Sequence, residues 1–230
     1  VMDEYIKLSH ERVMTERKEY TLFGHINVFV KDPLPSNINM TDVLMAIERD
    51  IPPNFLYEVD TILVGQFEDL NAREVKAAYM DGAIYVTNDQ SDNDDILDDI
   101  VHEIAHAVEK TYGMDLYGDG AVEQEFLGKK KRFLDILRAY GYNIPTEESY
   151  SSEYSKEFDE FVFYELGYEK AGNMVMGLFI TPYASVSISE YFATGFEAYF
   201  MRKEKNYLMN ISPTLYKKLD ELTNYSKENY

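Results

Sequence analysis

The chain has 230 residues and a formal net charge of −20, and this length suits one domain, or at most two small ones, with a sizeable core. The negative charge argues against non-specific binding to nucleic acids and equally disfavours anionic membrane surfaces. No apolar run approaches the roughly 18 residues that span a bilayer. Because the chain contains no cysteine, disulfides, thiolate metal ligands and a cysteine nucleophile are excluded as well.

The first part of the chain, residues 1–92, is predicted to be rich in strands. Hydrophobic periodicity and turn residues define its elements. In chain order we expect a charged amphipathic helix at 2–20, a strand at 25–32, a helix at 41–50, a strand at 59–67 and a hairpin at 77–88.

Local signals add detail to these elements. In HINVFVKD the alternate residues from Ile26 to Val30 form an apolar face that should pack on the core. Thr41 is expected to cap the helix that follows it, and a proline pair should end that helix. Asp81–Gly82 has the composition of a two-residue hairpin turn, with a β-rich run after it.

The second part of the chain, residues 93–230, is predicted to be almost wholly helical. The sequence shows no internal repeat and no linker, so residues 1–230 are expected to form one domain. Strands followed by helices indicate an α+β fold, with a small mixed sheet in the N-terminal half packed on a mainly helical C-terminal half. The helices are expected at about 93–111, 120–140, 155–167, 170–179, 187–204 and 213–224.

The stretch VHEIAHAVEK, residues 101–110, contains the pattern His-Glu-x-x-His at His102, Glu103 and His106. On a helix the two histidines differ by about 40° in azimuth and stack one turn apart. Both imidazoles can then reach one Zn²⁺ at about 2.0–2.1 Å. Glu103 is rotated by about 100° from His102, which suits a general base that meets the attacking water. The pattern is short, and the alternative is two polar residues on the wet face of an ordinary helix.

A catalytic zinc needs a third protein ligand and an open fourth position. The metalloproteases with a third histidine six residues after the second are excluded, because that position is Tyr112. His10 and His25 lie far upstream and are interpreted as structural or exposed residues. The best candidate is Glu190, on the helix predicted within TPYASVSISEYFATGFEAYF, where small residues one turn later allow a close approach. Glu197 is the weaker rival, and for either residue the alternative is a solvated glutamate.

Three stretches together resemble the catalytic domain of anthrax lethal factor and its relatives: VHEIAHAVEKTYG, FLGKKKRFLDILRAYG and PYASVSISEYFATGFEAYF. These are gluzincin-type zinc endopeptidases, a broad group that includes the clostridial Pro-Pro endopeptidases, and the resemblance covers roughly residues 80–225. It implies a zincin-like fold and one Zn²⁺ per chain, bound by His102, His106 and Glu190, with Glu103 as the base. The family has a tyrosine seven residues before the glutamate ligand. Here Tyr183 matches, and its hydroxyl would donate to the oxyanion.

The chain departs from the family pattern in three ways. Lethal factor has a glutamate four residues after its glutamate ligand, and this chain has Thr194, so Glu197 or Glu109 is a candidate to orient the ligands instead. The stretch 143–180 is longer than its counterpart and is expected to add helices at the rim of the cleft. The parts of lethal factor that serve delivery and kinase recognition have no counterpart here.

The sequence therefore predicts a zinc endopeptidase that acts on a peptide or protein, with no nucleic-acid or membrane partner. By analogy, an extended substrate should add to an edge strand formed by Ala83, Ile84, Tyr85 and Val86. The excess of acid favours basic residues near the cut, an effect that salt should weaken. The rival interpretation is a catalytically silent, lethal factor-like binding module. A purely structural zinc site conflicts with three ligands beside a base.

The compartment and the oligomeric state are not predicted. The N-terminus has no apolar stretch typical of a signal peptide. A chain that begins with Val is compatible with removal of a signal, so a soluble protein that is secreted or associated with a toxin or virion stays open.

Overall fold

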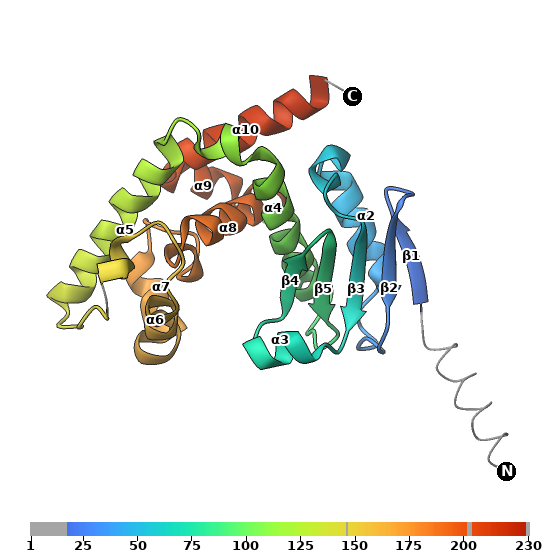
Figure 1. Cartoon of the computed structure of the whole chain (residues 1–230), viewed down its shortest axis with the longest axis horizontal. Helices are drawn as coiled ribbons and strands as arrows, with labels where there is room; N and C mark the ends of the chain where they lie inside the picture. Colours follow the sequence, from blue (N-terminus) through green and yellow to red (C-terminus); the bar gives the residue numbers. More distant parts are fainter. Residues whose placement is uncertain (1–17, 146, 202–203, 229–230) are drawn as a thin grey trace, which may run out of the picture. The chain divides into compact units, whose positions relative to one another are not determined.

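Residues 18–145, 147–201 and 204–228 are described by a computed structural model of the chain (Figure 1). The fold is α+β and mainly helical, with one mixed sheet, and this coarse prediction is confirmed. The chain divides into two compact units, Val1–Ala107 and Val108–Tyr230. None of the described helices has both the length and the apolar character needed to cross a bilayer.

The first unit contains a five-stranded sheet in the order β1-β2-β3-β5-β4 (Figure 1). Its three inner strands run parallel to one another, and both edge strands are antiparallel to their neighbours. The two edges of the sheet are therefore β1 and β4. The strands are β1 Lys18–Leu22, β2 Ile26–Val30, β3 Thr61–Gly65, β4 Ala77–Met80 and β5 Ala83–Thr87.

The predicted edge position of Ala83, Ile84, Tyr85 and Val86 is wrong. These residues lie in β5, which pairs with β3 on one side and with β4 on the other. The hairpin turn at Asp81–Gly82 is confirmed, with both residues at positive φ. The second strand of the hairpin, β5, pairs with β3, so the first strand, β4, forms the edge of the sheet. A peptide could add to the sheet beside β4 and not beside β5.

The core face of the sheet follows the predicted alternation. Ile26, Val28 and Val30 are all buried, while Asn27 between them is exposed. The same alternation continues in the neighbouring parallel strands, where Ile62, Val64, Ile84 and Val86 are fully buried. The burial of these aliphatic side chains is the main stabilising term of this unit.

Two predicted helix boundaries of the first unit are wrong. Helix α2, Met40–Asp50, is capped by Asn39, whose side chain accepts a hydrogen bond from the Thr41 amide at 3.0 Å. Thr41 is thus already inside the helix. Of the helix predicted at 2–20, residues 2–17 lie outside the described part of the chain, and Lys18–Tyr20 belong to β1. The short helix α3, Glu68–Arg73, was not predicted.

Helix α4, Asn93–Tyr117, carries the His-Glu-x-x-His pattern, and only Tyr112 departs from helical geometry inside it. Its first half is held beside β4. Lys76 forms an ion pair with Asp95 at 3.0 Å, just before β4 begins. The predicted apolar stripe is buried at Ile96, Ile100, Val101, Ile104, Ala105 and Val108, while Leu97 is only half-buried.

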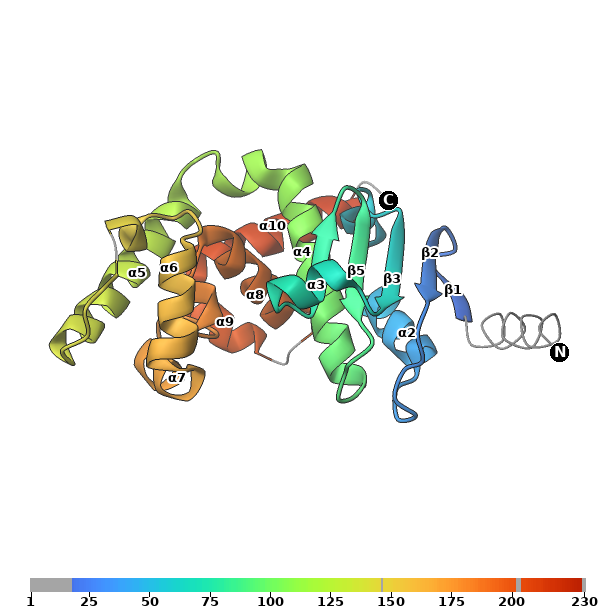
Figure 2. The same ribbon diagram turned by 60° about the horizontal axis from the view of Figure 1, so that its bottom comes forward.

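The described residues of the second unit form helices joined by loops, and none of them lies in a strand (Figure 2). The helix predicted at 187–204 ends at Phe200, and a separate helix follows. Gly141, at a φ of 83°, ends α5 as predicted. The helices are α5 Ala121–Ala139, α6 Lys156–Glu160 continued by a π-helical stretch Phe161–Leu166, α7 Tyr168–Val175, α8 Ile188–Phe200, α9 Lys205–Ile211 and α10 Pro213–Glu228.

Helix α8 is the central element of this unit, and all residues from Tyr191 to Tyr199 are buried. Gly195 allows α10 to pack closely, because a Cβ at this position would lie 2.4 Å from Leu215 Cδ2. A side chain here would require Leu215 or its helix to shift. The position of α8 matters for function because its first turn carries Glu190.

Two consecutive lysines of α5, Lys129 and Lys130, are buried, and burial lowers the pKa of each to about 8. Between about pH 8 and the ordinary lysine pKa of 10.5, these lysines bind more protons in the unfolded chain than in the folded chain. The free energy of unfolding should therefore rise with pH from 7.5 to 9.5, by about 1–2 kcal/mol for each lysine. Urea unfolding of the metal-free protein measures this rise, and Lys130→Met should reduce it. An equal rise in the variant would contradict the assignment.

Candidate metal centre

His102 and His106 project from successive turns of α4. Their ring centroids lie 4.9 Å apart, with the ring planes at 74° to each other. Both side chains are half-buried. The four-residue spacing places both imidazoles on one face of the helix, as the sequence predicts. The two rings can thus serve as neighbouring ligands of one ion.

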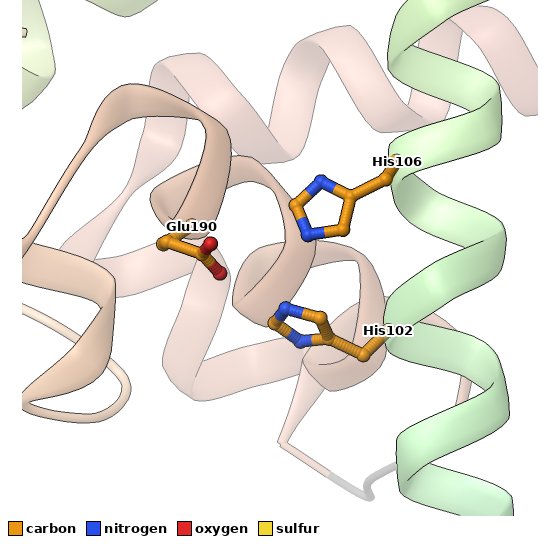
Figure 3. A group of neighbouring side chains, drawn as sticks. All are labelled: His102, His106 and Glu190. Carbon is orange, nitrogen blue, oxygen red and sulfur yellow. The ribbon is translucent and has the colours of Figure 1, made fainter. Parts of the chain in front are cut away.

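Glu190 lies in the first turn of α8. Ser187 caps this helix, and its hydroxyl accepts a hydrogen bond from the Glu190 amide at 3.2 Å. Each of His102, His106 and Glu190 offers one ligand atom, and these three atoms all lie within 4.8 Å of one another. Figure 3 shows the carboxylate directed toward the two imidazole rings. The structure therefore brings together the three residues that the sequence selects.

The chemistry of this donor set fits zinc. Two imidazole nitrogens and one carboxylate oxygen match the ligands of catalytic zinc sites, in which three protein groups leave a fourth position open. Calcium and magnesium prefer all-oxygen sites, which this group does not offer. The described residues thus contain a group able to hold one zinc ion.

Glu103 is buried, with 7% of its surface exposed. Its carboxylate accepts a hydrogen bond from the backbone amide of Tyr79, at 2.6 Å. Tyr79 belongs to the edge strand β4, and its hydroxyl donates to the Glu58 carbonyl at 3.0 Å. The side chain next to the two candidate ligand histidines is therefore fixed against the open edge of the sheet.

Tyr183 lies in a 3₁₀ turn, Tyr183–Ser185, that leads into α8. Its pKa is raised far above the ordinary tyrosine value, first by burial and then by the negative charges of Glu190 and Asp159. The Glu190 carboxylate also accepts a hydrogen bond from the phenol. Tyr183 thus stays protonated at any physiological pH and remains a hydrogen-bond donor beside Glu190.

Further acidic and phenolic groups of the second unit surround Tyr183 and Glu190. The Tyr154 hydroxyl donates to the Asp159 carboxylate at 2.8 Å, and burial raises the pKa of Asp159. Burial, followed by the charges of Asp159 and Glu190, raises the pKa of Tyr168 to about 12. The sequence did not single out Tyr154, Asp159 or Tyr168. They lie in the stretch 143–180, whose extra length was the one available signal.

The turn of α4 before the histidines contains a half-buried acid, Asp99. Burial raises the pKa of Asp99 to about 6, although Gln90 donates a hydrogen bond to its carboxylate at 2.8 Å.

Glu109 lies one turn after His106 on α4 and is hydrogen-bonded to Ser189, the residue before Glu190. It accepts hydrogen bonds from the Tyr117 hydroxyl at 2.5 Å and from the Ser189 hydroxyl. Thr194 does not orient the Glu190 side chain, because its hydroxyl donates a hydrogen bond to the backbone carbonyl of Glu190 on the same helix, at 2.9 Å. Glu109 and Glu197 were the two candidates to replace the glutamate that lethal factor has at the position of Thr194. Of these two, Glu109 contacts the segment that carries Glu190. Glu197 is buried on the same helix as Glu190.

The remaining predicted site residues take no part in this group. The exposed His25 ring lies near its own hairpin turn, with Nδ1 2.9 Å from the Phe23 carbonyl oxygen. His10 lies outside the described residues. Ala83, Ile84, Tyr85 and Val86 lie inside the sheet, between β3 and β4.

Comparison of the chain with protein-family models, with curated proteins and with solved structures gives no match. A functional proposal for this chain therefore depends on its own residues and their geometry.

Proposed function

We propose that the chain is a zinc-dependent endopeptidase with a zincin-like fold, of the gluzincin type that its sequence resembles. The observation that carries the proposal is the convergence of one ligand atom each from His102, His106 and Glu190. Two further residues support it. Glu103 follows the first ligand on the same helix, and Tyr183 bonds to the third.

The residues divide the chemistry among them. When bound to His102, His106 and Glu190, zinc supplies a Lewis acid that polarises a peptide carbonyl and acidifies water. Glu103 takes the proton of the attacking water and later gives it to the leaving amine. The Tyr183 hydroxyl donates a hydrogen bond to the developing oxyanion, which is where such a donor has its largest effect.

The substrate backbone should run along β4. This strand pairs with β5 on one side only, and in the described sheet no strand pairs with its other side. An extended peptide can add there by backbone hydrogen bonds. Because the Tyr79 amide on this strand bonds to Glu103, a peptide beside β4 would pass next to the proposed base.

The surroundings favour basic residues in the substrate. The chain carries a net charge of −20, and Asp159 adds a carboxylate close to Tyr183 and Glu190. Opposite charges on a substrate would be attracted, and added salt would screen the attraction. The expected substrate is thus an extended peptide with Lys or Arg near the cleaved bond.

The rival proposal, a silent binding module, predicts partner binding without cleavage. The residues do not favour it. A module without catalysis would not need a carboxylate beside the two ligand histidines, whereas the endopeptidase proposal gives Glu103 the role of the base.

A zinc titration tests the proposal. Metal-free protein receives increasing zinc while the cleavage of a denatured protein substrate is followed by mass spectrometry. Cleavage should rise up to one zinc per chain and then level off, and a chelator should abolish it. Zinc binding without any cleavage would favour the binding module, and cleavage that survives removal of the metal would overturn the proposal.

Replacing Tyr183 by phenylalanine should lower kcat by about 10²–10³-fold, because the variant lacks the donor to the oxyanion. The affinity for zinc should change little, since Tyr183 is not a ligand. Steady-state kinetics measure the first effect and chelator competition the second. The matched control is Tyr207→Phe. Tyr207 lies on α9, and its hydroxyl accepts a hydrogen bond from the Gly177 amide. Equal kcat values for Tyr183→Phe and the parent would remove Tyr183 from the mechanism.

A further inference from the structure

Two adjacent lysines on α5 contact the segment that carries Tyr183 and Glu190. Lys130 has 1% of its surface exposed, and Lys129 has 8%. Their neighbour Lys131 is solvated, with 71% of its side chain exposed, and pairs with Asp135. Lysines are almost never fully buried without a specific reason. The first two ammonium groups therefore need an explanation that the third does not.

The Lys130 ammonium group bonds to backbone rather than to an acid. It donates to the carbonyl of Val186 at 3.0 Å and to that of Ser151 at 2.9 Å. The rings of Phe158 and Phe126 lie beside it, with centroids 4.8 and 5.4 Å from Nζ. Methionine has a similar volume and would pack among these rings without desolvating a charge. Compared with methionine, the ammonium group adds cation–π contacts with the two rings and directed bonds to the two carbonyls, and only the bonds fix the position of the backbone.

Those bonds fix the turn that carries Tyr183. The Val186 amide donates a hydrogen bond to the Tyr183 carbonyl at 3.0 Å, which closes the turn. The Lys130 ammonium group donates to the carbonyl of Val186 itself. Two residues later the Ile188 amide donates to the Ser152 carbonyl at 2.8 Å. Lys130 therefore ties the turn to the loop at Ser151–Ser152 from the buried side.

Lys129 holds the same segment on the other side of Glu190. Its ammonium group donates to the Tyr191 hydroxyl at 2.8 Å and to the Ser212 hydroxyl. The Tyr191 hydroxyl donates in turn to Glu125 at 2.8 Å. Tyr191 directly follows Glu190, so the two lysines contact the chain four residues before the proposed ligand and one residue after it.

We propose that Lys129 and Lys130 are positioning residues whose buried ammonium groups hold the segment Tyr183–Tyr191, so that the Tyr183 hydroxyl and the Glu190 carboxylate face one reaction centre. The inference rests on the proposed function, because it assigns these residues to the geometry of that site. Lys130 sets the position of Tyr183, and Lys129 sets that of Glu190. Neither lysine touches the substrate.

The test compares Lys129→Met and Lys130→Met with Lys131→Met, the same change at the adjacent exposed position. Lys130→Met should lower kcat by about 10–100-fold with little change in KM, because small displacements of a catalytic group have effects of this size. Lys129→Met should weaken zinc binding by about 10–100-fold, as expected when a group that orients a ligand is lost. Lys131→Met should match the parent in both.

Amide hydrogen exchange provides a readout that does not depend on catalysis. In metal-free protein, peptides covering residues 183–191 should exchange at least ten times faster in both buried-lysine variants than in Lys131→Met. Peptides from β2 and β3 should be unchanged, which shows that the effect is local. Unchanged exchange at 183–191, with parental kcat and zinc affinity, would overturn the inference.

Two milder variants keep the test decisive if a methionine variant does not fold. Tyr191→Phe removes the hydroxyl that Lys129 bonds and should also weaken zinc binding by about tenfold. Lys130→Gln keeps a donor without the charge and should show an intermediate exchange rate at 183–191. Parental values in both would overturn the inference. A parent that binds zinc without cleaving peptides would refute the proposed function, whereas exchange and zinc affinity would still decide the role of the lysines.

Discussion

Replacing Glu103 by glutamine is expected to lower peptide cleavage by about 10²–10⁴-fold, the usual contribution of a general base. The amide cannot accept the proton of the attacking water, while its size and its position on α4 stay the same. The carbonyl oxygen of the glutamine can still accept the hydrogen bond from the Tyr79 amide, which spans 2.6 Å to the carboxylate. The fold should therefore be kept, and the loss should be chemical.

The matched control for this change is Glu221→Gln. Glu221 is an exposed residue of α10 in a surface ion pair with Lys217, and such pairs contribute little to stability. Its cleavage rate and its zinc affinity should equal those of the parent. Zinc affinity of Glu103→Gln, measured by chelator competition, should also stay within a few-fold of the parent. Cleavage at the parental rate by Glu103→Gln would show that another group is the base.

Replacing His106 by alanine is expected to abolish zinc binding at micromolar concentrations and all cleavage with it. The change removes one of three ligand groups whose donor atoms lie within 4.8 Å of one another. The two remaining donors cannot form a catalytic zinc site, which takes three protein ligands. Zinc content after dialysis against a buffered low zinc concentration measures the effect.

The control for the ligand variant is His25→Ala, which removes an exposed imidazole from the turn between β1 and β2. It should retain one zinc per chain and full cleavage. Glu190→Gln should behave like His106→Ala, because a neutral amide is a poor zinc ligand. Retention of one zinc ion per chain by both His106→Ala and Glu190→Gln would place the metal elsewhere.

The helix of the candidate metal site could be predicted because its signals are local. The spacing of His102 and His106 and the apolar stripe behind them lie within one helix, so the period of 3.6 residues is sufficient. The third residue of the group needed chemistry as well as pattern. Glu190 was chosen because a catalytic zinc takes a third ligand, and the structure brings it to the two histidines.

Strand order could not be predicted, because it depends on contacts far apart in the sequence. The hairpin at Asp81–Gly82 was correctly recognised, but its turn does not show which arm pairs with β3. The structure pairs the second arm with β3 and leaves β4 at the edge. The predicted substrate-binding strand, β5, is therefore one strand further inside the sheet than the edge strand β4. The prediction of His102, Glu103 and His106 does not depend on this order.

The groups that support the site were missed because composition hides them. Lys129 and Lys130 belong to the run KKK, which is typical of a solvated helix surface. Only the packing of α5 against other helices distinguishes these two lysines from the exposed Lys131. Asp159 is one of many acids in the chain. Its hydrogen bond to Tyr154 and its proximity to Tyr183 are tertiary contacts.

The most direct test of the central claim is a mass-spectrometric digest of a diverse peptide library by zinc-loaded parent protein, with Glu103→Gln in parallel. We predict cuts by the parent that are absent from the variant, with Lys or Arg enriched near the cleaved bonds. The sites of these cuts would also define the specificity. If neither protein cuts although both hold one zinc per chain, the proposal of an endopeptidase is contradicted, and the binding module becomes the favoured proposal.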